Sequence, residues 1–273
     1  HDPFEILGRH SWKEGVVIRV HLPGATQAAI RCGDALLPMQ RYQRSALFEW
    51  YGSECPHSIS YTVEWEDAGG HHHSHHDPYA FPPLISDAGL SQFSEGQHYR
   101  AYQILGAHLS RHEGVEGIRF AVWAPNAERV SVVGDFNQWD GRCHPMRNRG
   151  NSGVWELFIP ELTPGTLYKF ELRDRHGGIH LKTDPYGRRF EMRPATASVV
   201  EHSSFQWQDE AWMRQRAATE WLHRPMSIYE VHPGSWQRHT DGGFLSYREL
   251  ASGLIPHVKR LGFTHIELLP VTE

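Results

Sequence analysis

Short runs of alternating apolar and polar residues predict β-strands through most of the first 200 positions. In the first hundred residues these runs lie at 16–22, 28–31, 47–51 and 59–65. The first run ends at Pro23-Gly24, a turn signal, and the second follows closely. Several short strands at this spacing favour a β-sandwich.

The second hundred residues repeat the first. FEILGRH at 4–10 returns as YQILGAH at 102–108, and YTVEW at 61–65 returns as YKFEL at 168–172. IRVHLP likewise returns as FAVWAP, and Asp77-Pro78-Tyr79 returns as Asp184-Pro185-Tyr186. Matches in the same order predict two tandem all-β domains of one immunoglobulin-like fold, residues 1–98 and 99–207. We expect the polar, Ser- and Gly-rich stretch 84–97 to be a linker between them.

Beyond residue 207 the pattern becomes helical. Asp209 is expected to cap a helix over 210–222, within a linker that spans 208–225. Residues 226–273 predict a strand, a loop, a helix and a second strand, with Ser246 and Glu249 at the spacing of a capping box. The apolar face of this helix is predicted to contain Leu250, Leu254, Val258 and Leu261. Two strands joined by a helix over this distance predict a parallel βαβ unit.

Composition narrows the choice of partner and compartment. The 27 basic and 32 acidic residues give a net charge of −5, which disfavours nucleic acid and suits a neutral partner such as a sugar. No apolar run is long enough to cross a membrane. The cysteines Cys32, Cys55 and Cys143 are odd in number, widely spaced and lack a CxxC pair. We therefore expect reduced thiols in a cytoplasmic protein, with no metal or redox role.

The most conspicuous cluster is the histidine tract at 71–76. Histidine is the commonest metal-binding side chain, and such a tract binds nickel or zinc weakly. It occupies the position that 174–178 fill in the second repeat. We therefore expect a solvated, variable hairpin loop rather than a functional metal site.

One motif occurs in the second repeat alone. GDFNQW at 134–139 follows a predicted strand and presents Trp139 at the tip of an Asp/Asn turn, in which Asp135 and Asn137 are expected to form the turn. It resembles the signature of the starch- and glycogen-binding modules that precede branching and debranching barrels. The resemblance implies that Trp139 stacks on a glucose ring and that Lys169 bonds sugar hydroxyls. The alternative is that Trp139 packs against its own domain.

Two departures qualify this resemblance. The glycogen-binding modules carry a second stacking Trp at the next hairpin, where this sequence has Gly177-Gly178-Ile179-His180. The corresponding turn of the first repeat, 31–36, has no aromatic residue, so a spacer or docking role is expected for that domain.

The segments YEVHPGSW, SYRELASGLIPHVKRLGF and THIELLPVTE resemble the first two strands and first helix of the catalytic (β/α)₈ barrel of bacterial glycogen branching enzymes. These belong to the α-amylase superfamily. The resemblance implies a retaining enzyme, acting as a monomer without cofactor, that cleaves α-1,4-glucan and forms α-1,6 branches. It puts the catalytic carboxylates after barrel strands four, five and seven, beyond residue 273, so we expect a segment of a longer enzyme. Glu230 and Glu267 are expected to be structural.

Other functions remain open from the sequence. A debranching or trehalose-releasing relative would share the sugar-binding module and the barrel. A non-catalytic glycogen-binding protein would need the module alone.

Overall fold

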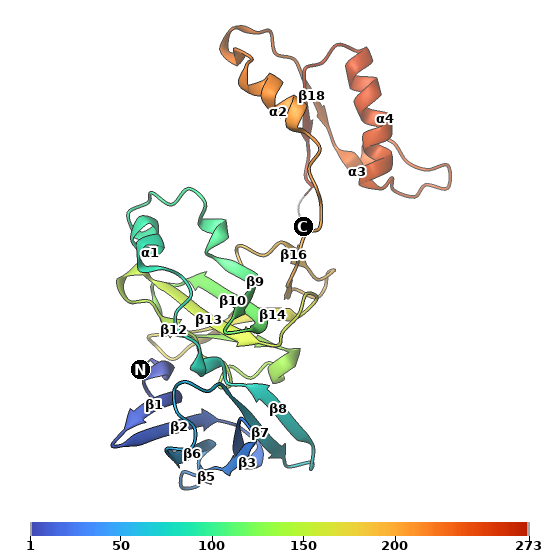
Figure 1. The fold of residues 1–273 in the computed structure, drawn as a ribbon. Helices are drawn as coiled ribbons and strands as arrows, with labels where there is room; N and C mark the ends of the chain where they lie inside the picture. Colours follow the sequence, from blue (N-terminus) through green and yellow to red (C-terminus); the bar gives the residue numbers. More distant parts are fainter. Residues whose placement is uncertain (1, 272–273) are drawn as a thin grey trace. The chain divides into compact units, whose positions relative to one another are not determined.

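The computed structural model describes residues 2–271, which form two compact units divided between Ser204 and Phe205. The first unit consists mostly of antiparallel sheets, and the second combines helices with two parallel strands (Figure 1). Each unit is described by itself.

Residues 8–76, the first sheet pair, form two four-stranded antiparallel sheets. One has the order β1 (Gly8–Trp12), β2 (Gly15–His21), β6 (Leu47–Gly52) and β5 (Gln40–Arg41). The other has the order β4 (Ala35–Pro38), β3 (Ala25–Cys32), β7 (Tyr61–Asp67) and β8 (His72–His76). Alternate residues face inward, and the core between the sheets includes Ile18, Ile30, Phe48, Tyr61 and Val63.

Residues 106–199, the second sheet pair, are built in the same way. One sheet has the order β12 (Arg147–Asn148), β13 (Val154–Pro160), β10 (Val115–Trp123) and β9 (Gly106–His112). The other has the order β11 (Ala127–Gly134), β14 (Leu167–Asp174), β17 (Ser198–Val199) and β16 (Arg189–Phe190), and β15 (Ile179–Lys182) also pairs with β14. The core between them includes Ile118, Phe120, Val132, Leu157 and Phe170.

The repeated sequence motifs occupy equivalent places in the two sheet pairs. The Tyr61 hydroxyl donates to Asp77 Oδ2 at 2.5 Å, and the Tyr168 hydroxyl donates to Asp184 Oδ2 at 2.6 Å. All four side chains are buried, so each sheet pair contains the same satisfied polar bridge in its interior. Gly8 and Gly106 both have positive φ, at 85° and 99°.

The two sheet pairs also share core. Leu7 and Tyr79 belong to the hydrophobic cluster of the second sheet pair, and Phe4 and Leu47 pack against it. The Tyr79 hydroxyl donates to the carbonyl of Pro145 at 3.1 Å. The first unit is therefore continuous across the two sheet pairs.

The stretch 84–97 is not a plain linker, which corrects the expectation from its composition. It contains helix α1 (Asp87–Ser94), whose first turn is capped by Ser86. Ile85 and Leu90 are buried in one cluster with Leu105, Ala121 and Val154. Because one apolar residue carries most of the helix's packing, its sequence shows no helical periodicity.

The histidine tract is likewise not a loop. His72–His76 form β8, which pairs with β7 in the register Thr62↔His76 and Trp65↔His73. The expectation failed because histidine has no marked strand preference, whereas pairing with a neighbouring strand supplies the hydrogen bonds.

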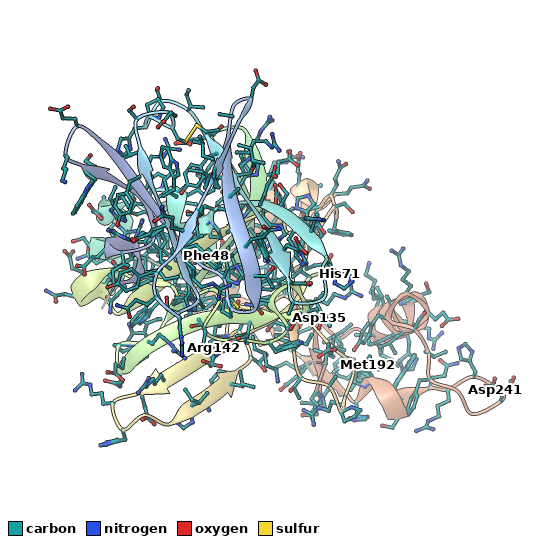
Figure 2. All side chains as sticks on the ribbon, turned by 90° about the horizontal axis from the view of Figure 1, so that it is seen from below. Phe48, His71, Asp135, Arg142, Met192 and Asp241 are labelled. Atoms are coloured by element: carbon teal, nitrogen blue, oxygen red, sulfur yellow. A yellow bond between two sulfur atoms is a disulfide. The ribbon has the colours of Figure 1, made fainter. Side chains whose placement is uncertain are left out.

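Cys32 and Cys55 are placed as a disulfide, with Cα atoms 5.7 Å apart, among the side chains of the first sheet pair (Figure 2). The expectation of three reduced thiols is therefore wrong for this pair, and Cys143 is the free cysteine among the described residues. The 23-residue separation concealed the contact, because strand pairing brings the two positions together.

In the second unit, β18 (Ile228–Val231) and β19 (His265–Leu268) are parallel, as predicted. Between them lie α3 (Pro233–Trp236) and α4 (Tyr247–Arg260), and α4 starts with the predicted Ser246–Glu249 capping box. Leu250, Leu254 and Val258 are buried, but Leu261 lies after the last turn and is exposed. Helix α2 (Glu210–Ala217) is shorter than predicted, and the Asp209 side chain does not cap it.

The remaining elements are single turns of 3₁₀ helix: η1 (Pro3–Glu5), η2 (Pro78–Ala80), η3 (Ala101–Gln103), η4 (Asp135–Asn137), η5 (Gly150–Ser152) and η6 (Trp221–His223). Within residues 2–271, no helix combines the length and apolar character needed to cross a bilayer.

Candidate functional site

The GDFNQW motif forms a compact turn at the end of β11. After Gly134 the chain enters η4, and Gln138 and Trp139 then both take left-handed backbone conformations, with φ of 55° and 60°. Two consecutive non-glycine residues in this region are uncommon and are held there by their surroundings. The Trp139 backbone N–H donates to the Gly134 carbonyl at 2.9 Å, which closes the turn.

Asn137 holds the turn from inside, and it is 8% exposed. Its Oδ1 accepts from the Gly134 N–H at 3.0 Å, and its Nδ2 donates to the Val132 carbonyl at 2.9 Å. Nδ2 also lies 2.9 Å from His144 Nδ1. Burial lowers the pKa of His144 to about 4, so the imidazole is neutral near pH 7 and its Nδ1 accepts this hydrogen bond. Asn137 is thus a structural member of the turn.

Trp139 is half-buried and is absent from the hydrophobic core clusters of the described residues. Its indole Nε1 donates to Asp135 Oδ1 at 2.8 Å, which fixes the ring across the turn. The ring is therefore oriented by a polar contact at the surface rather than by packing in a core.

Lys169 lies on the strand next to this turn. Val133 in β11 pairs with Lys169 in β14, and Gly134 pairs with Tyr168. Tyr168 and Phe170 point into the core, so Lys169 between them points to the outer face of the sheet. Its Nζ donates to Thr196 Oγ1 at 2.6 Å. The structure thus brings both sequence-predicted residues to the same end of one strand pair.

The loop that follows Trp139 lies against the same outer face. An added Cβ at Gly141 would come within 2.0 Å of Glu171 Oε1, so the loop backbone packs directly on the Glu171 carboxylate. Glu171 accepts from Arg129 Nη2 at 2.6 Å. This contact fixes the loop against β11 and β14 beside the candidate residues.

Two apolar residues on this face were not singled out from the sequence. Leu181 pairs with Glu171 and Ile179 pairs with Arg173, and each is 53% exposed. They lie on β15, where the resemblance implies a second tryptophan. Exposed aliphatic residues in a four-residue strand give no signal in the sequence that separates them from ordinary strand residues.

The first sheet pair has no comparable turn. There β3 passes through Gly33 and Asp34 directly into β4, with Cys32 paired to Ala35. Arg31 in this hairpin forms an ion pair with Glu64 at 2.5 Å. This hairpin therefore presents no aromatic side chain, since residues 31–36 contain none.

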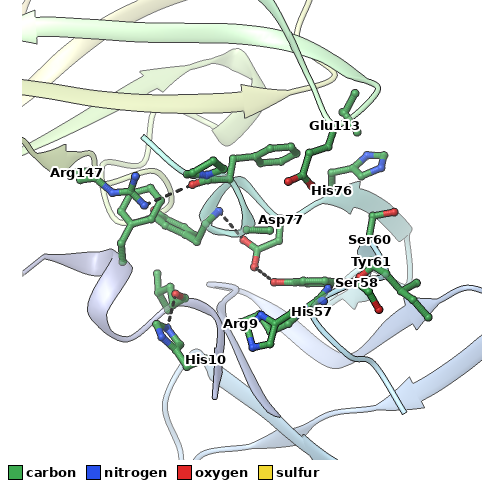
Figure 3. Close-up of a pocket in the computed structure, with 18 residues that line it drawn as sticks. Arg9, His10, His57, Ser58, Ser60, Tyr61, His76, Asp77, Glu113 and Arg147 are labelled. Carbon is green, nitrogen blue, oxygen red and sulfur yellow. Dashed lines mark hydrogen bonds between the residues drawn. The ribbon is translucent and has the colours of Figure 1, made fainter. Parts of the chain in front are cut away.

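A cavity of about 720 Å³ lies between the two sheet pairs (Figure 3). Arg9 donates to the carbonyl of Ile59 at 2.7 Å, and Arg147 donates to the carbonyl of Phe81 at 3.4 Å. Burial raises the pKa of Asp77 to about 6, although its carboxylate accepts from Tyr61. The cations here are already engaged with backbone carbonyls, as expected of a seam between two packed bodies.

The histidine tract makes local contacts with carboxylates. Asp67 Oδ2 lies 3.1 Å from His73 Nε2 and 3.2 Å from His71 Nδ1, and the hydrogen bond from His73 holds the pKa of Asp67 well below its usual range. Among residues 2–271, no three His, Cys, Asp or Glu side chains are arranged to hold a metal ion.

Comparisons with known proteins agree with this arrangement. Residues 1–79 match the family described as "alpha-1,4-glucan branching enzyme GlgB, N-terminal domain". Residues 104–187 match "Carbohydrate-binding module 48 (Isoamylase N-terminal domain)", and this range contains both Trp139 and Lys169. One solved structure, a putative alpha amylase from Salmonella typhimurium, covers 62% of this chain and 25% of its own at 25% identity. Its TM-score of 0.42 is too low to bear on the fold.

Similar proteins extend over the whole chain. The "1,4-alpha-glucan branching enzyme GlgB" of Nitrosococcus oceani is 56% identical, that of Methylococcus capsulatus 54%, and that of Cellvibrio japonicus 52%. Each match covers 100% of this chain but 36%, 37% and 38% of the respective relative. The chain thus spans little more than a third of the length of these relatives. Over its whole length, it is related to the GlgB family of 1,4-alpha-glucan branching enzymes.

Proposed function

We propose that this chain is part of a 1,4-α-glucan branching enzyme, which cleaves an α-1,4 link and transfers the chain to a 6-hydroxyl. Residues 1–98 and 99–207 would be two tandem immunoglobulin-like domains, and 226–273 would begin the catalytic (β/α)₈ barrel. The matched Tyr–Asp bridges of the two sheet pairs support the first assignment. The parallel pairing of β18 with β19 on either side of α4 supports the second.

We further propose that Trp139 and Lys169 bind α-glucan for this enzyme. The observation that carries the proposal is the position of Trp139, outside the described hydrophobic cores and tied to Asp135 beside Lys169. A pyranose ring exposes a face of C–H groups, and an indole face desolvates them while the ring hydroxyls keep polar partners. The ammonium of Lys169 is held by Thr196, so it is oriented before the sugar binds.

Ile179 and Leu181 extend this surface. Both are exposed on the sheet face to which Lys169 points. In place of a second aromatic platform they offer aliphatic contact to the sugar C–H groups. Aliphatic side chains lack a π-face, so we expect weaker binding than a site with two tryptophans would give.

The debranching alternative receives less support. The carbohydrate-binding module is described with an isoamylase name, but residues 1–79 match a family described for GlgB itself. A branching enzyme accounts for both matches.

The deciding experiment is Trp139→Ala, with glucan affinity and unfolding measured together. If the indole is a platform, maltoheptaose or glycogen binding weakens by about 1–3 kcal/mol, by analogy with aromatic stacking on flat ligands. The free energy of unfolding then changes by about 1 kcal/mol or less. If Trp139 instead serves as core, the same change costs about 3–5 kcal/mol of stability. Trp123→Ala is the matched control, because Trp123 is 55% exposed on the opposite sheet of the same sheet pair.

A further inference from the structure

A groove of about 470 Å³ lies between the two sheet pairs, bordered by the GDFNQW turn. This volume is in the range of about 300–1,000 Å³ typical of small-molecule sites. It has room for a short run of sugar rings rather than a single one. None of the sequence motifs pointed to it, because its two walls come from different repeats.

The first sheet pair supplies an apolar wall. Val20, Leu22, Pro23 and Trp65 line the groove, and His73 stacks on the Trp65 indole with ring centres 5.0 Å apart and planes inclined by 18°. Trp65 packs on the first core while it lines the groove, so its ring is held in place. His75 contacts the same indole edge-on, with ring centres 4.6 Å apart, so a sugar would meet a cluster of Trp65 and two histidines beside the aliphatic residues.

The second sheet pair supplies a more polar wall, which is continuous with the candidate glucan site. Phe136, Asn137, Gln138 and Asp140 line the groove, and Trp139 lies between the last two in sequence. Gln138 is exposed at the turn, so it stands at the boundary between the groove and the Trp139 site. Gln138 lines the groove, and the next residue in the chain is Trp139.

Four carboxylates line the groove, those of Asp67, Asp77, Asp140 and Glu161. Asp140 pairs with Arg142, and Asp67 and Glu161 lie within hydrogen-bonding distance of His73 and His76. Burial lowers the pKa of His21 and His75 and lowers that of His144 to about 4, so these imidazoles are neutral near pH 7. The groove thus combines carboxylates, which accept hydrogen bonds, with neutral imidazoles and an apolar wall. The carboxylates disfavour an anion, and this combination suits a polyhydroxyl ligand.

The groove is also preformed. Tyr79 of the first repeat is buried in the second core, and His21 Nδ1 donates to the Arg142 carbonyl at 3.2 Å across the boundary. The two walls are therefore fixed relative to each other, which lowers the entropy cost of binding a chain that spans them.

We infer that this groove is a second subsite for α-1,4-glucan, in which a chain stacked on Trp139 continues past Gln138 and packs against Trp65 of the first sheet pair. The inference rests on the glucan-binding function proposed above for Trp139. It gives the first sheet pair a binding role, although its own turn carries no sugar signature.

The test compares a short and a long ligand on the 273-residue chain by calorimetry. Maltotriose is expected to engage the Trp139 site alone, whereas maltoheptaose reaches the groove and binds more tightly. Trp65→Ala should weaken maltoheptaose binding by about tenfold, comparable with the loss of one aromatic stacking contact, and leave maltotriose binding within about twofold. Trp12→Ala is the matched control, because Trp12 is 46% exposed on the first sheet pair and does not line the groove.

Trp65→Ala also removes packing on the first core, so its effect on binding is not isolated from its effect on stability. A second measurement therefore uses the unmodified chain. Hydrogen–deuterium exchange of the unmodified chain should slow in 20–24 and 63–76 with maltoheptaose but not with maltotriose. If these segments do not respond to maltoheptaose while Trp139→Ala still weakens maltotriose binding, the groove inference is overturned and the Trp139 site stands. If neither sugar binds the unmodified chain, the proposed function is overturned together with the inference.

Discussion

The two sheet pairs have equivalent buried features but differ at one surface turn. Each contains a buried Tyr–Asp bridge and a left-handed glycine at the start of its first strand. At the equivalent turn, however, the first sheet pair makes a two-residue hairpin through Gly33 and Asp34, and the second inserts η4 and a loop that reaches Pro145. The polar bridge stabilises the fold in both sheet pairs, whereas the surface turn differs between them and can hold binding residues in one of them.

A second difference concerns the tyrosine after each buried aspartate. Tyr79 is 9% exposed and joins the core of the second sheet pair, whereas Tyr186 is 37% exposed. The same Asp-Pro-Tyr sequence therefore serves as a docking anchor in one place and as a surface residue in the other within the first unit. The repeated sequence identifies equivalent positions, but it does not tell how deeply each tyrosine is buried or how much it stabilises the fold.

The largest expected effect tests this contrast. Tyr79→Ala removes a buried aromatic ring and its hydrogen bond to Pro145, so the free energy of unfolding should fall by about 3–5 kcal/mol. Tyr186→Ala should cost about 1 kcal/mol or less. Urea unfolding of both variants measures the difference. Equal losses in the free energy of unfolding would show that the two tyrosines stabilise the fold equally. The contrast between them would then be wrong.

The next effect concerns the buried carboxyl of Asp77. Burial raises its pKa to about 6, above the value near 3.8 expected in the unfolded chain. Between these values the folded state binds more protons, so this group makes stability fall as pH rises from about 4 to 6, by up to about 3 kcal/mol. Asp77→Asn removes the titration, and the difference in unfolding free energy between the native chain and the variant should follow this slope.

The native chain must be compared with the Asp77→Asn variant because His144 also changes stability with pH, in the opposite direction. Burial depresses its pKa, so protonation of the unfolded chain destabilises the fold as pH falls below about 6.5. Asp184→Asn provides the second comparison, because burial also raises the pKa of Asp184 and the sign should be the same. A flat difference curve for Asp77→Asn would mean that its carboxylate is already ionised at pH 4.

The sequence predicted those features that depend on local order or repetition. The strands around Trp50, Val63 and Phe170 alternate because one face of each meets a core, and the α4 cap is defined by two residues three apart. The parallel pairing of β18 with β19 followed from the length of the connection. These are properties that a short window of sequence contains.

Features that depend on contacts between distant segments could not be predicted in this way. Helix α1 is stabilised by Leu105 and Val154, and the Cys32–Cys55 bond depends on strand pairing. The groove beside Trp65 needs walls from both repeats. For the candidate site, the sequence supplied Trp139 and Lys169 through resemblance, while the exposed Ile179 and Leu181 emerged only from the register of β15 on β14.

The smallest expected effect tests how the two sheet pairs are joined outside their shared core. His76 Nδ1 in β8 lies 2.6 Å from Glu161 Oε1, which follows β13, and both side chains are partly exposed, at 28% and 44%. Solvent screens such a pair, so a double-mutant cycle with His76→Ala and Glu161→Ala should give a coupling of about 0.5 kcal/mol that declines with added salt. The exposed pair Arg31–Glu64 is the matched control, because it lies within the first sheet pair and does not join the two sheet pairs. A coupling of several kcal/mol would show that the two sheet pairs are held together by charge as well as by Tyr79.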